Sequence, residues 1–457
     1  MAVFSVVSGL CSKENELIIV SPHWEGIQYE FGRAFEAWYQ ENVGKAIRVR
    51  WRDLGGASQI EKALVATYQA TPDSCGMDVF FGGGMDPFEN LHRRGLLYPY
   101  RVSDEVLKDL PESFSGVRII GEDYAYYGTA LSSFGILENR RVTQRLGLPE
   151  VKTWRDLADS RLAGWVSSTD PRKSGSVHMI YEIILQAYGW DEGWGVIYGM
   201  SGNVRSFLQN SSAPVKEVSA GDAAFAVTID INGLTQQSFL GEENVIYRIP
   251  RGVSVVTPDG IAILRGAPNL EAAKLFVEFV LSEKGQKLWM KPKGTEGGAL
   301  RFNITRMGVL PKLYPNDLSK LLVPFNPFQV GEGEIGFRYN SELGSRRWHV
   351  LNDLIGQTII DVHRWLRRAW RAASKVQDEV VRQELLRKIK KPFVTESEAI
   401  ELASYWRKDK VRARRMANEW MEGAVRRYQE VIEVATKFAV IGDEGGMHMT
   451  NICKGQE

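Results

Sequence analysis

The chain has 457 residues, of which 44% are hydrophobic and 25% are charged, and its formal net charge is +1. This length and composition are those of a soluble globular protein with two or three domains. A net charge so close to zero excludes a protein that binds nucleic acid through its whole surface, and three cysteines without a C-x-x-C pair exclude a disulfide scaffold and the usual zinc sites. We therefore expect no nucleic-acid partner, no metal and no cofactor.

The first residues have the character of an incomplete export signal. Residues 2–10 form an apolar run that ends at Cys11, but no Lys or Arg precedes the run. An apolar N-terminus without a targeting role is the alternative. Leu10 stands where a lipoprotein cleavage site has a small residue, so membrane tethering through Cys11 stays open. No later run reaches the roughly 18 uninterrupted apolar residues of a membrane-spanning helix.

Strands and helices alternate in the first segment of the chain. The expected elements are strands at 17–20, 47–51 and 77–81 and helices at 31–38 and 58–65, with Ser58 as the cap of the second helix. This order predicts a parallel, doubly wound sheet, and ligands of such sheets bind beyond the carboxyl ends of the strands. The turn at His23 and Trp24 lies there, and so do the glycines at 82–84.

A second α/β segment begins near Trp154. Its expected elements are a strand at 165–166, a helix at about 176–188 and a strand at 223–231. The apolar residues 255–264 then predict a strand that returns to the first lobe. Helix 271–288 follows, with Asn269 as its expected cap.

The last third of the sequence predicts a helical hairpin. Apolar residues keep helical spacing from about 349 to 376, and Pro392 interrupts the pattern. The capping box of Thr395 and Glu398 then begins a second long helix that reaches about residue 438. Arginines are frequent on both helices and alternate with Glu and Asp, which favours a solvated face over a surface for anionic lipid or nucleic acid.

The strongest chemical signal is the loop DPRKSGS, which follows Thr169 and ends where the next helix begins. Unpaired N–H groups and the positive end of the helix dipole attract anions at such a position. Gly175 lets a ligand approach the backbone, and the hydroxyls of Ser174 and Ser176 can both donate. The loop is therefore predicted to bind an anion or another polar ligand, and simple N-capping by Ser174 is the alternative.

Two more candidates follow strands of the first segment. Gly83 and Gly84 offer a wall for a ligand, or only a tight turn, because the glycine spacing of a dinucleotide loop is absent. His23 can donate a hydrogen bond to a ligand and Trp24 can stack on one. Packing of both rings in the core is the alternative.

Asp230 and Asn232 stand at the end of strand 223–231. A carboxylate in such an apolar strand needs a partner if it is buried. A ligand hydroxyl or ammonium group would satisfy it, and so would an internal arginine such as Arg251.

No catalytic motif is present. The sequence lacks the G-x-S-x-G nucleophile elbow, the phosphate-binding G-x-x-x-x-G-K-[ST] loop and a cysteine with plausible His and Asn partners. The carboxylates are numerous, but spacing alone does not pair any of them. We therefore expect a binding protein and not an enzyme, although catalysis does not depend on a known motif.

Seven strings of residues resemble, in their order and spacing, a known family: the type 2 periplasmic solute-binding proteins of ABC importers, in the branch for ferric iron, thiamine and organophosphates. The strings are GMDVFFGGG at 76–84, YGTALSS at 127–133, DPRKSGS at 170–176, AGDAA at 220–224, TPDGIAI at 257–263, GAPNLEAAKLF at 266–276 and SEKGQ at 282–286. Each string is weak alone, and the combination over residues 15–300 is specific. The last third of the chain is not covered.

The resemblance implies an α/β fold of two Rossmann-like lobes joined by a hinge, to which the helical hairpin is an addition. Lobe 1 would take residues 15–126 and 252–340, lobe 2 residues 127–251, and the extension residues 341–440. It also implies a monomeric receptor, periplasmic or extracellular, that clamps a small-molecule ligand between its lobes. The closed form would then dock on an ABC permease in the membrane.

The family's ligand cleft would be lined here by His23, Gly83, Gly84, the Ser174–Ser176 helix start and Asp230. Ferric-binding members place adjacent tyrosines near the position of Asp230 and Ile231, and this sequence has none there. One His and one Asp make a poor ferric site, so we expect a small polar or anionic ligand such as a phosphorylated one. Ferric transport, an enzyme of the same fold acting on a phosphorylated substrate, and a sensor whose helical hairpin binds a partner are the alternatives.

Overall fold

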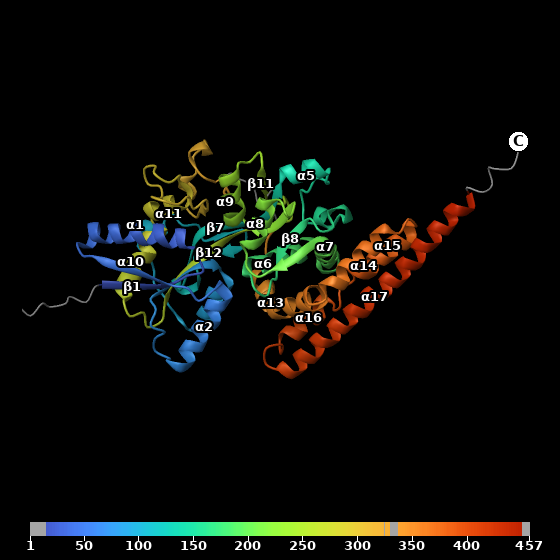
Figure 1. The fold of residues 1–457 in the computed structure, drawn as a ribbon. Coiled ribbons are helices and arrows are strands. Elements are labelled where there is room, and N and C mark those ends of the chain that lie inside the picture. The colour runs from blue at the N-terminus through green and yellow to red at the C-terminus, as the bar shows by residue number, and fades with distance from the viewer. Residues whose placement is uncertain (1–14, 324, 330–336, 450–457) are drawn as a thin grey trace, which may run out of the picture. The chain divides into compact units, whose positions relative to one another are not determined.

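The computed structural model of the chain describes residues 15–323, 325–329 and 337–449, with side chains as far as residue 438 (Figure 1). The apolar run at 2–10, Cys11 and Cys453 lie outside the described residues. Within those described ranges, no helix is long and apolar enough to cross a bilayer. The chain divides into two compact units, which are described one at a time.

Each unit is assembled from segments that are not consecutive in the sequence. Unit 1 holds residues up to 110, 120–129 and 260–304, and unit 2 holds 111–119, 130–259 and everything from 305 onward. Residues 305–340 thus cluster with unit 2, whereas the sequence analysis assigned them to the first lobe. The reason is β13 (Met307–Gly308), which pairs with Leu131 and Ala130 in β7 (Tyr127–Asn139).

Unit 1 is built on a sheet in the strand order β2-β1-β3-β12. Its strands are β1 (Asn15–Val20), β2 (Ile47–Arg52), β3 (Val79–Gly84), β12 (Val256–Leu264) and β4 (Leu97–Tyr98), the last antiparallel to β12. β1 pairs in parallel with both β2 and β3, which confirms the predicted arrangement. The carboxyl ends of these three strands therefore share one edge of the sheet.

The helices of unit 1 are α1 (Glu25–Val43), α2 (Ala57–Ala70), α3 (Asp86–Arg93), α4 (Asp104–Leu107), α10 (Leu270–Leu281) and α11 (Glu283–Met290). The prediction of a single helix over 271–288 was wrong. Ser282 has extended backbone angles and its hydroxyl accepts from the N–H of Gly285 at 3.3 Å, which ends one helix and caps the next.

Two predicted helix caps also differ in the structure. Gly56, and not Ser58, precedes α2. Asn269 does stand before α10, but its side-chain amide donates to Asp78 at 3.0 Å instead of capping the helix. Asp78 is fully buried and also accepts from the backbone N–H of Asn269 at 2.6 Å, so the amide serves a buried carboxylate.

Unit 2 contains a mixed sheet in the strand order β7-β10-β8-β9. The further strands are β8 (Val166–Thr169), β9 (Val204–Leu208), β10 (Phe225–Ile229) and β11 (Val245–Arg248), with a short ribbon of β5 (Ser113–Phe114) and β6 (Val117–Arg118). β10 and β11 pair antiparallel to β7, while β8 is parallel to both β10 and β9. β9 lies at the edge of this order.

Five helices accompany this sheet: α5 (Arg140–Leu146), α6 (Gly175–Tyr188), α7 (Trp190–Asn203), α8 (Ala213–Ala220) and α9 (Asp230–Leu240). Every residue of α6 from Val177 to Leu185 is buried. A helix that is buried all round must be covered on the side that faces away from its own sheet. In unit 2 the C-terminal helices provide that cover, because α6 contacts them through Glu182 and His178.

The C-terminal extension is helical as predicted, but it is not a hairpin of two helices. It consists of α13 (Ser341–Ile355), a π-helical turn η6 (Gly356–Ile360), α14 (His363–Lys375), α15 (Glu379–Lys390), α16 (Glu396–Ala403) and α17 (Lys410–Met449). The predicted capping box of Thr395 and Glu398 is confirmed, and it opens the short α16. Figure 1 shows α14 and α15 alongside the long α17, and α14 also packs on α7.

Two buried tyrosines hold the π-helical turn. The hydroxyl of Tyr428 in α17 donates to the carbonyl of Thr358 at 2.6 Å, and that of Tyr198 in α7 donates to the Thr358 hydroxyl at 3.0 Å. A π-helical turn changes the regular hydrogen bonding of a helix, so side-chain donors are valuable there. The turn is therefore fixed from both the α/β part and the extension of unit 2.

A buried ion pair also joins α6 to the extension. The guanidinium of Arg347 in α13 donates to Glu182 in α6 at 2.7, 3.0 and 3.1 Å, and both side chains are almost fully buried. Arg347 also reaches the half-exposed Glu396 of α16 at 2.5 Å. The fully buried carboxylate needs this arginine, because an isolated charge in the interior is costly.

We predict that Arg347→Met destabilises the protein by about 3–5 kcal/mol, because it leaves Glu182 charged and unpaired in the interior. Glu396→Gln is the matched control on the exposed side of the same arginine, and it should cost less than about 1 kcal/mol. The double variant Glu182→Leu, Arg347→Met should recover most of the loss. Urea unfolding measures all three, and equal losses for Arg347→Met and Glu396→Gln would contradict the assignment.

Candidate functional site

The predicted site residues of unit 1 lie at the shared carboxyl edge of its parallel strands. The His23 ring is buried, with its centroid 4.7 Å from that of Phe81 and 5.8 Å from that of Trp289. Trp24 precedes α1, is 39% exposed and makes an edge contact with Phe302 at 5.4 Å. The buried His23 therefore packs in an aromatic cluster, and Trp24 is the ring that is available at the surface.

Gly82 and Gly83, near the carboxyl end of β3, are required by their backbone conformation and by their neighbours. Gly82 and Gly83 have φ of +103° and +91°, which side chains with a Cβ rarely adopt. A Cβ on Gly82 would lie 2.4 Å from the His23 ring, and one on Gly83 would lie 2.5 Å from the Cβ of Ala57 at the start of α2. Gly84 is exposed with no atom near its Cβ position. The end of β3 thus packs closely against His23 and against the start of α2, while Gly84 is exposed.

The strongest predicted site in unit 2 is the start of α6. Ser174 is the N-cap, its hydroxyl accepts from the N–H of Val177 at 3.3 Å, and it lies 3.1 Å from the hydroxyl of Ser176. By helix geometry the N–H groups of Gly175 and Ser176 have no acceptor inside the helix. Gly175 and the neighbouring Lys173 are exposed. The helix start therefore offers two free N–H donors, two hydroxyls and an adjacent cation.

Thr169 and Asn232 both hold the loop after β9. The Thr169 hydroxyl donates to the carbonyl of Asn210 at 2.8 Å, and the Asn232 amide donates to that of Ser211 at 3.0 Å. Thr169 is fully buried, and Asn232 is partly exposed. Both side chains thus hold the loop after β9, and ligand contact by Thr169 and Asn232 stays a prediction.

Arg172, in the middle of the DPRKSGS loop, is held between two carboxylates. It donates to Asp170 at 2.8–3.0 Å and, from its other edge, to Asp361 of the C-terminal extension at 2.7 and 2.9 Å. Gly356 in the π-helical turn makes room for it, because a Cβ there would lie 2.6 Å from the Arg172 Nη1 atom. Bidentate pairs fix orientation as well as distance, so the extension helps to position this loop.

Asp230 lies inside a buried polar network. Its carboxylate accepts from the N–H of Ser133 and from that of Ile231, both at 2.7 Å, and from the Ser133 hydroxyl at 3.2 Å. Burial raises the pKa of Asp230 to about 6, and the positive charge of Arg306 opposes the rise. The internal arginine is thus Arg306, whereas the suggested Arg251 is exposed. The bonds to Asp230 come from within unit 2, where they tie β7 to the start of α9.

Arg306 was not found by sequence reasoning, and neither were Asp259 and Ser132. All three are buried, and the Arg306 guanidinium contacts both the Asp259 carboxylate and the Ser132 hydroxyl. The three residues come from β13 and its neighbourhood, β12 and β7, so no local pattern joins them. The strings at 127–133 and 257–263 contain two of the three, which is the one signal that pointed toward this network.

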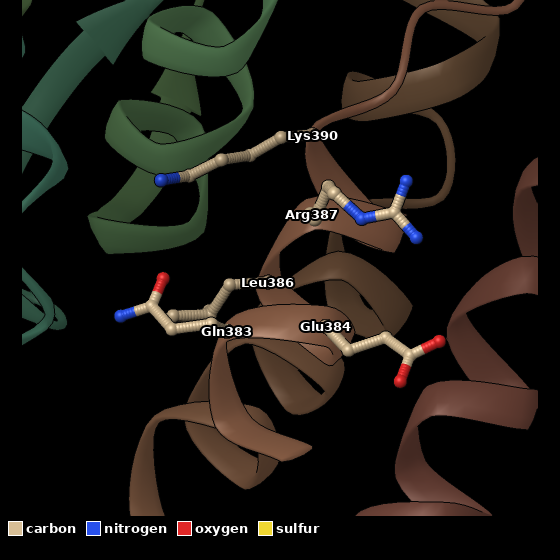
Figure 2. A pocket seen from close by; sticks show the side chains of 5 residues that line it. All are labelled: Gln383, Glu384, Leu386, Arg387 and Lys390. Atoms are coloured by element: carbon tan, nitrogen blue, oxygen red, sulfur yellow. The ribbon is translucent and has the colours of Figure 1, made fainter. Parts of the chain in front are cut away.

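The hollow lined by Gln383, Glu384, Leu386, Arg387 and Lys390 lies elsewhere, on α15 of the extension, with a volume of about 520 Å³. Figure 2 shows that Gln383 and Lys390 extend from one side of the helix while Glu384 and Arg387 extend from the other. The polar groups do not converge on a common point, which a small-ligand site requires. Within the described residues no group of three or more His, Cys, Asp and Glu could hold a metal ion.

The fold is that of the two-lobed periplasmic binding proteins. Residues 74–295 match the family model described as bacterial extracellular solute-binding protein. The match joins segments of both units, including the glycines that end β3 and the start of α6.

Two curated relatives share 28% of their aligned residues with this chain. One is an uncharacterized protein of Haemophilus influenzae, aligned over 280 residues that cover 58% of this chain and 75% of the relative. The other is the phosphoglycerate transport regulatory protein PgtC of Salmonella typhimurium, aligned over 160 residues that cover 35% of this chain and 39% of the relative. The chain thus matches well under half of PgtC.

Two solved structures with the same fold bind different ligands. One is the periplasmic binding protein AfuA from Actinobacillus pleuropneumoniae with fructose 6-phosphate bound, at 20% identity and a TM-score of 0.58. The other is the apo ferric ion-binding protein A of Pasteurella haemolytica, at 14% identity and a TM-score of 0.55. Each is covered almost completely, 100% and 96%, by about 75% of this chain. The remaining quarter of the chain has no counterpart in either.

We predict that the buried carboxyl group of Asp230 makes stability depend on pH. The folded protein keeps this proton up to about pH 6, whereas the unfolded chain loses it near pH 3.8, so wild-type stability falls as the pH rises through that window. Asp230→Asn cannot titrate, so its free energy of unfolding relative to wild type should increase by roughly 2–3 kcal/mol between pH 4 and pH 7. Urea unfolding at both pH values tests this, and a constant difference would contradict it.

Proposed function

We propose that this protein is an extracytoplasmic receptor of an ABC importer that binds a small phosphorylated organic anion at the start of α6. One observation carries the proposal: the N–H groups of Gly175 and Ser176 are free, and the hydroxyls of Ser174 and Ser176 and the cation of Lys173 stand beside them. Hydrogen-bond donors at the positive end of a 14-residue helix suit a phosphate group.

The relatives support a phosphorylated ligand. PgtC is a phosphoglycerate transport regulatory protein, and AfuA carries bound fructose 6-phosphate. A membrane permease is the partner that this class of receptor requires.

Ferric iron is the second candidate, since ferric-binding proteins share the fold. Hard oxygen ligands such as phenolates suit this ion. Two tyrosines interact electrostatically with Asp230, and their hydroxyls already donate to backbone carbonyls: Tyr247 to that of Ser133 at 3.0 Å and Tyr314 to that of Gly308 at 2.8 Å. Burial raises the pKa of both tyrosines well above the ordinary value, so a ferric ion would have to break these hydrogen bonds and deprotonate a buried phenol. The residues of unit 2 therefore favour an organic anion over the metal.

We expect Ser176→Asp to abolish the binding of a phosphorylated ligand, because its carboxylate would occupy the position of the phosphate and repel it. Ser176→Asn is the matched control, because asparagine has the size of aspartate without its charge. This variant should weaken binding about tenfold or less, the scale of one lost hydrogen bond. Isothermal titration calorimetry with fructose 6-phosphate and 3-phosphoglycerate measures both, with ferric citrate as the competing probe. Unchanged affinity in Ser176→Asp, or binding of ferric citrate alone, would overturn the proposal.

We also expect Asp361→Asn to weaken binding of the same ligands by about fivefold, the scale of one charged pair, because it releases one of the two carboxylates that orient Arg172 in the ligand loop. Stability should change by less than about 1 kcal/mol, since Arg172 and Asp361 are both partly exposed. Glu433→Gln, which breaks the exposed pair with Lys437 on α17, should leave affinity unchanged. Equal affinities for the two variants would show that the extension does not position the loop.

A further inference from the structure

One side of α14 carries four cations in a line. Arg364, Arg368, Arg371 and Lys375 are separated by four, three and four residues, which places them on the same side of a helix, and all four are exposed. We call these residues the basic stripe. The helix has no acidic residue, so the alternation with Glu and Asp expected for the arginine-rich helices does not hold here. The stripe is about 17 Å long, at 1.5 Å for each residue.

The cations around the basic stripe lie close to one another and, among the described residues, form no ion pair with an acidic side chain. Arg367, on the flank of the stripe, donates to the carbonyl of Arg205 at 3.0 Å, and its buried Nε atom has no hydrogen-bond partner. Burial lowers the pKa of Arg367, and the positive charges of Arg371 and Arg205 lower it further. Arg205 lies on β9, the edge strand of unit 2, so the positive surface continues from the helix onto the sheet.

Some other cations of the extension have an acidic partner. Lys388 lies 2.6 Å from Glu430, and Lys437 lies 2.7 Å from Glu433. Across the part of the chain that the structure describes, no carboxylate lies within ion-pair distance of the basic stripe, Arg367 or Arg205. Like charges three and four residues apart destabilise a helix, so the sequence keeps them at a cost to its own stability. Such a surface suits an anionic partner from outside the chain.

We propose that the basic stripe docks on a membrane surface that is rich in anionic phospholipid headgroups. A protein interface of comparable strength needs an apolar centre with pockets. This face has only the half-buried Trp365, which lies between Arg364 and Arg368 at 5.2 and 5.3 Å from their guanidinium carbons. A layer of mobile headgroups needs no shape match, only charge, and Trp is a residue typical of the membrane interface.

The opposite side of α14 rules out insertion into the bilayer. Its apolar residues are Leu366, Ala369, Trp370 and Ala373, and all four are buried against the rest of unit 2. The helix therefore lies at the level of the headgroups and binds by charge, which makes the contact reversible and sensitive to salt. This docking is independent of the ligand site and would add to the contact with a permease.

The test is co-sedimentation of the full chain with vesicles. We expect binding to vesicles of phosphatidylglycerol and phosphatidylcholine at low salt, none to phosphatidylcholine alone, and release at about 0.5 M salt. The triple variant R364Q/R368Q/R371Q should bind about 100-fold more weakly, from about fivefold for each cation near an anionic surface. Its thermal midpoint should match or exceed that of wild type, because like-charge repulsion is relieved.

The matched control is R412Q/R414Q/R415Q, which removes the same charge from the exposed start of α17 and should retain vesicle binding. Wild type that fails to bind anionic vesicles, or that binds them as well after the loss of the basic stripe, would overturn the proposal. Stripe-dependent binding to a poly-glutamate peptide but not to vesicles would also overturn it, and would assign the surface to an acidic protein partner. Unchanged binding of fructose 6-phosphate by the triple variant shows that the receptor itself is intact.

Discussion

The buried carboxylate of Glu182 is the constraint on which the architecture of unit 2 depends. It sits in a helix that is buried on all sides, and an unpaired charge there would cost several kcal/mol. Its partner, Arg347, belongs to the C-terminal extension. The same helix carries the buried His178, which bonds to Asn352 of α13 at 2.8 Å and whose pKa burial lowers to about 3, so it stays neutral. The α/β part therefore contains buried polar groups that the extension helps to satisfy.

The same pairing affects the DPRKSGS loop at 170–176, because this loop and α6 are one continuous segment. Pairing at Glu182 fixes the body of α6, and pairing of Arg172 with Asp361 fixes the residues just before its first turn. Gly356 leaves the room that the Arg172 guanidinium needs, at a π-helical turn that Tyr198 and Tyr428 hold in place. The extension thus helps to hold in place the start of α6, where we propose that the ligand binds.

The sequence was sufficient for features that depend on neighbours in the chain. Alternation of strands and helices predicted the parallel sheet of unit 1, and Thr395 with Glu398 predicted the capping box of α16. It was insufficient where a residue's partner lies far away. No local sequence pattern near Arg347 or Arg306 predicts a partner carboxylate more than forty residues away. The spacing of apolar residues also did not predict the helix breaks near Ser282 and at the π-helical turn. Helical periodicity continues across such breaks, so it overestimates helix length.

The buried cations and the exposed cations of unit 2 differ in whether they have an acidic partner. The buried and half-buried guanidinium groups of Arg306, Arg347 and Arg172 each meet a carboxylate, as the cost of desolvation requires. Four of the five cations of α14 are exposed, so folding does not require a partner for them, yet all five gather on a helix without a single acid. Stability alone would favour their replacement or pairing. The proposed docking on an anionic membrane surface would explain why the row stays unpaired, because the headgroups would then supply the counter-charges that the chain itself does not.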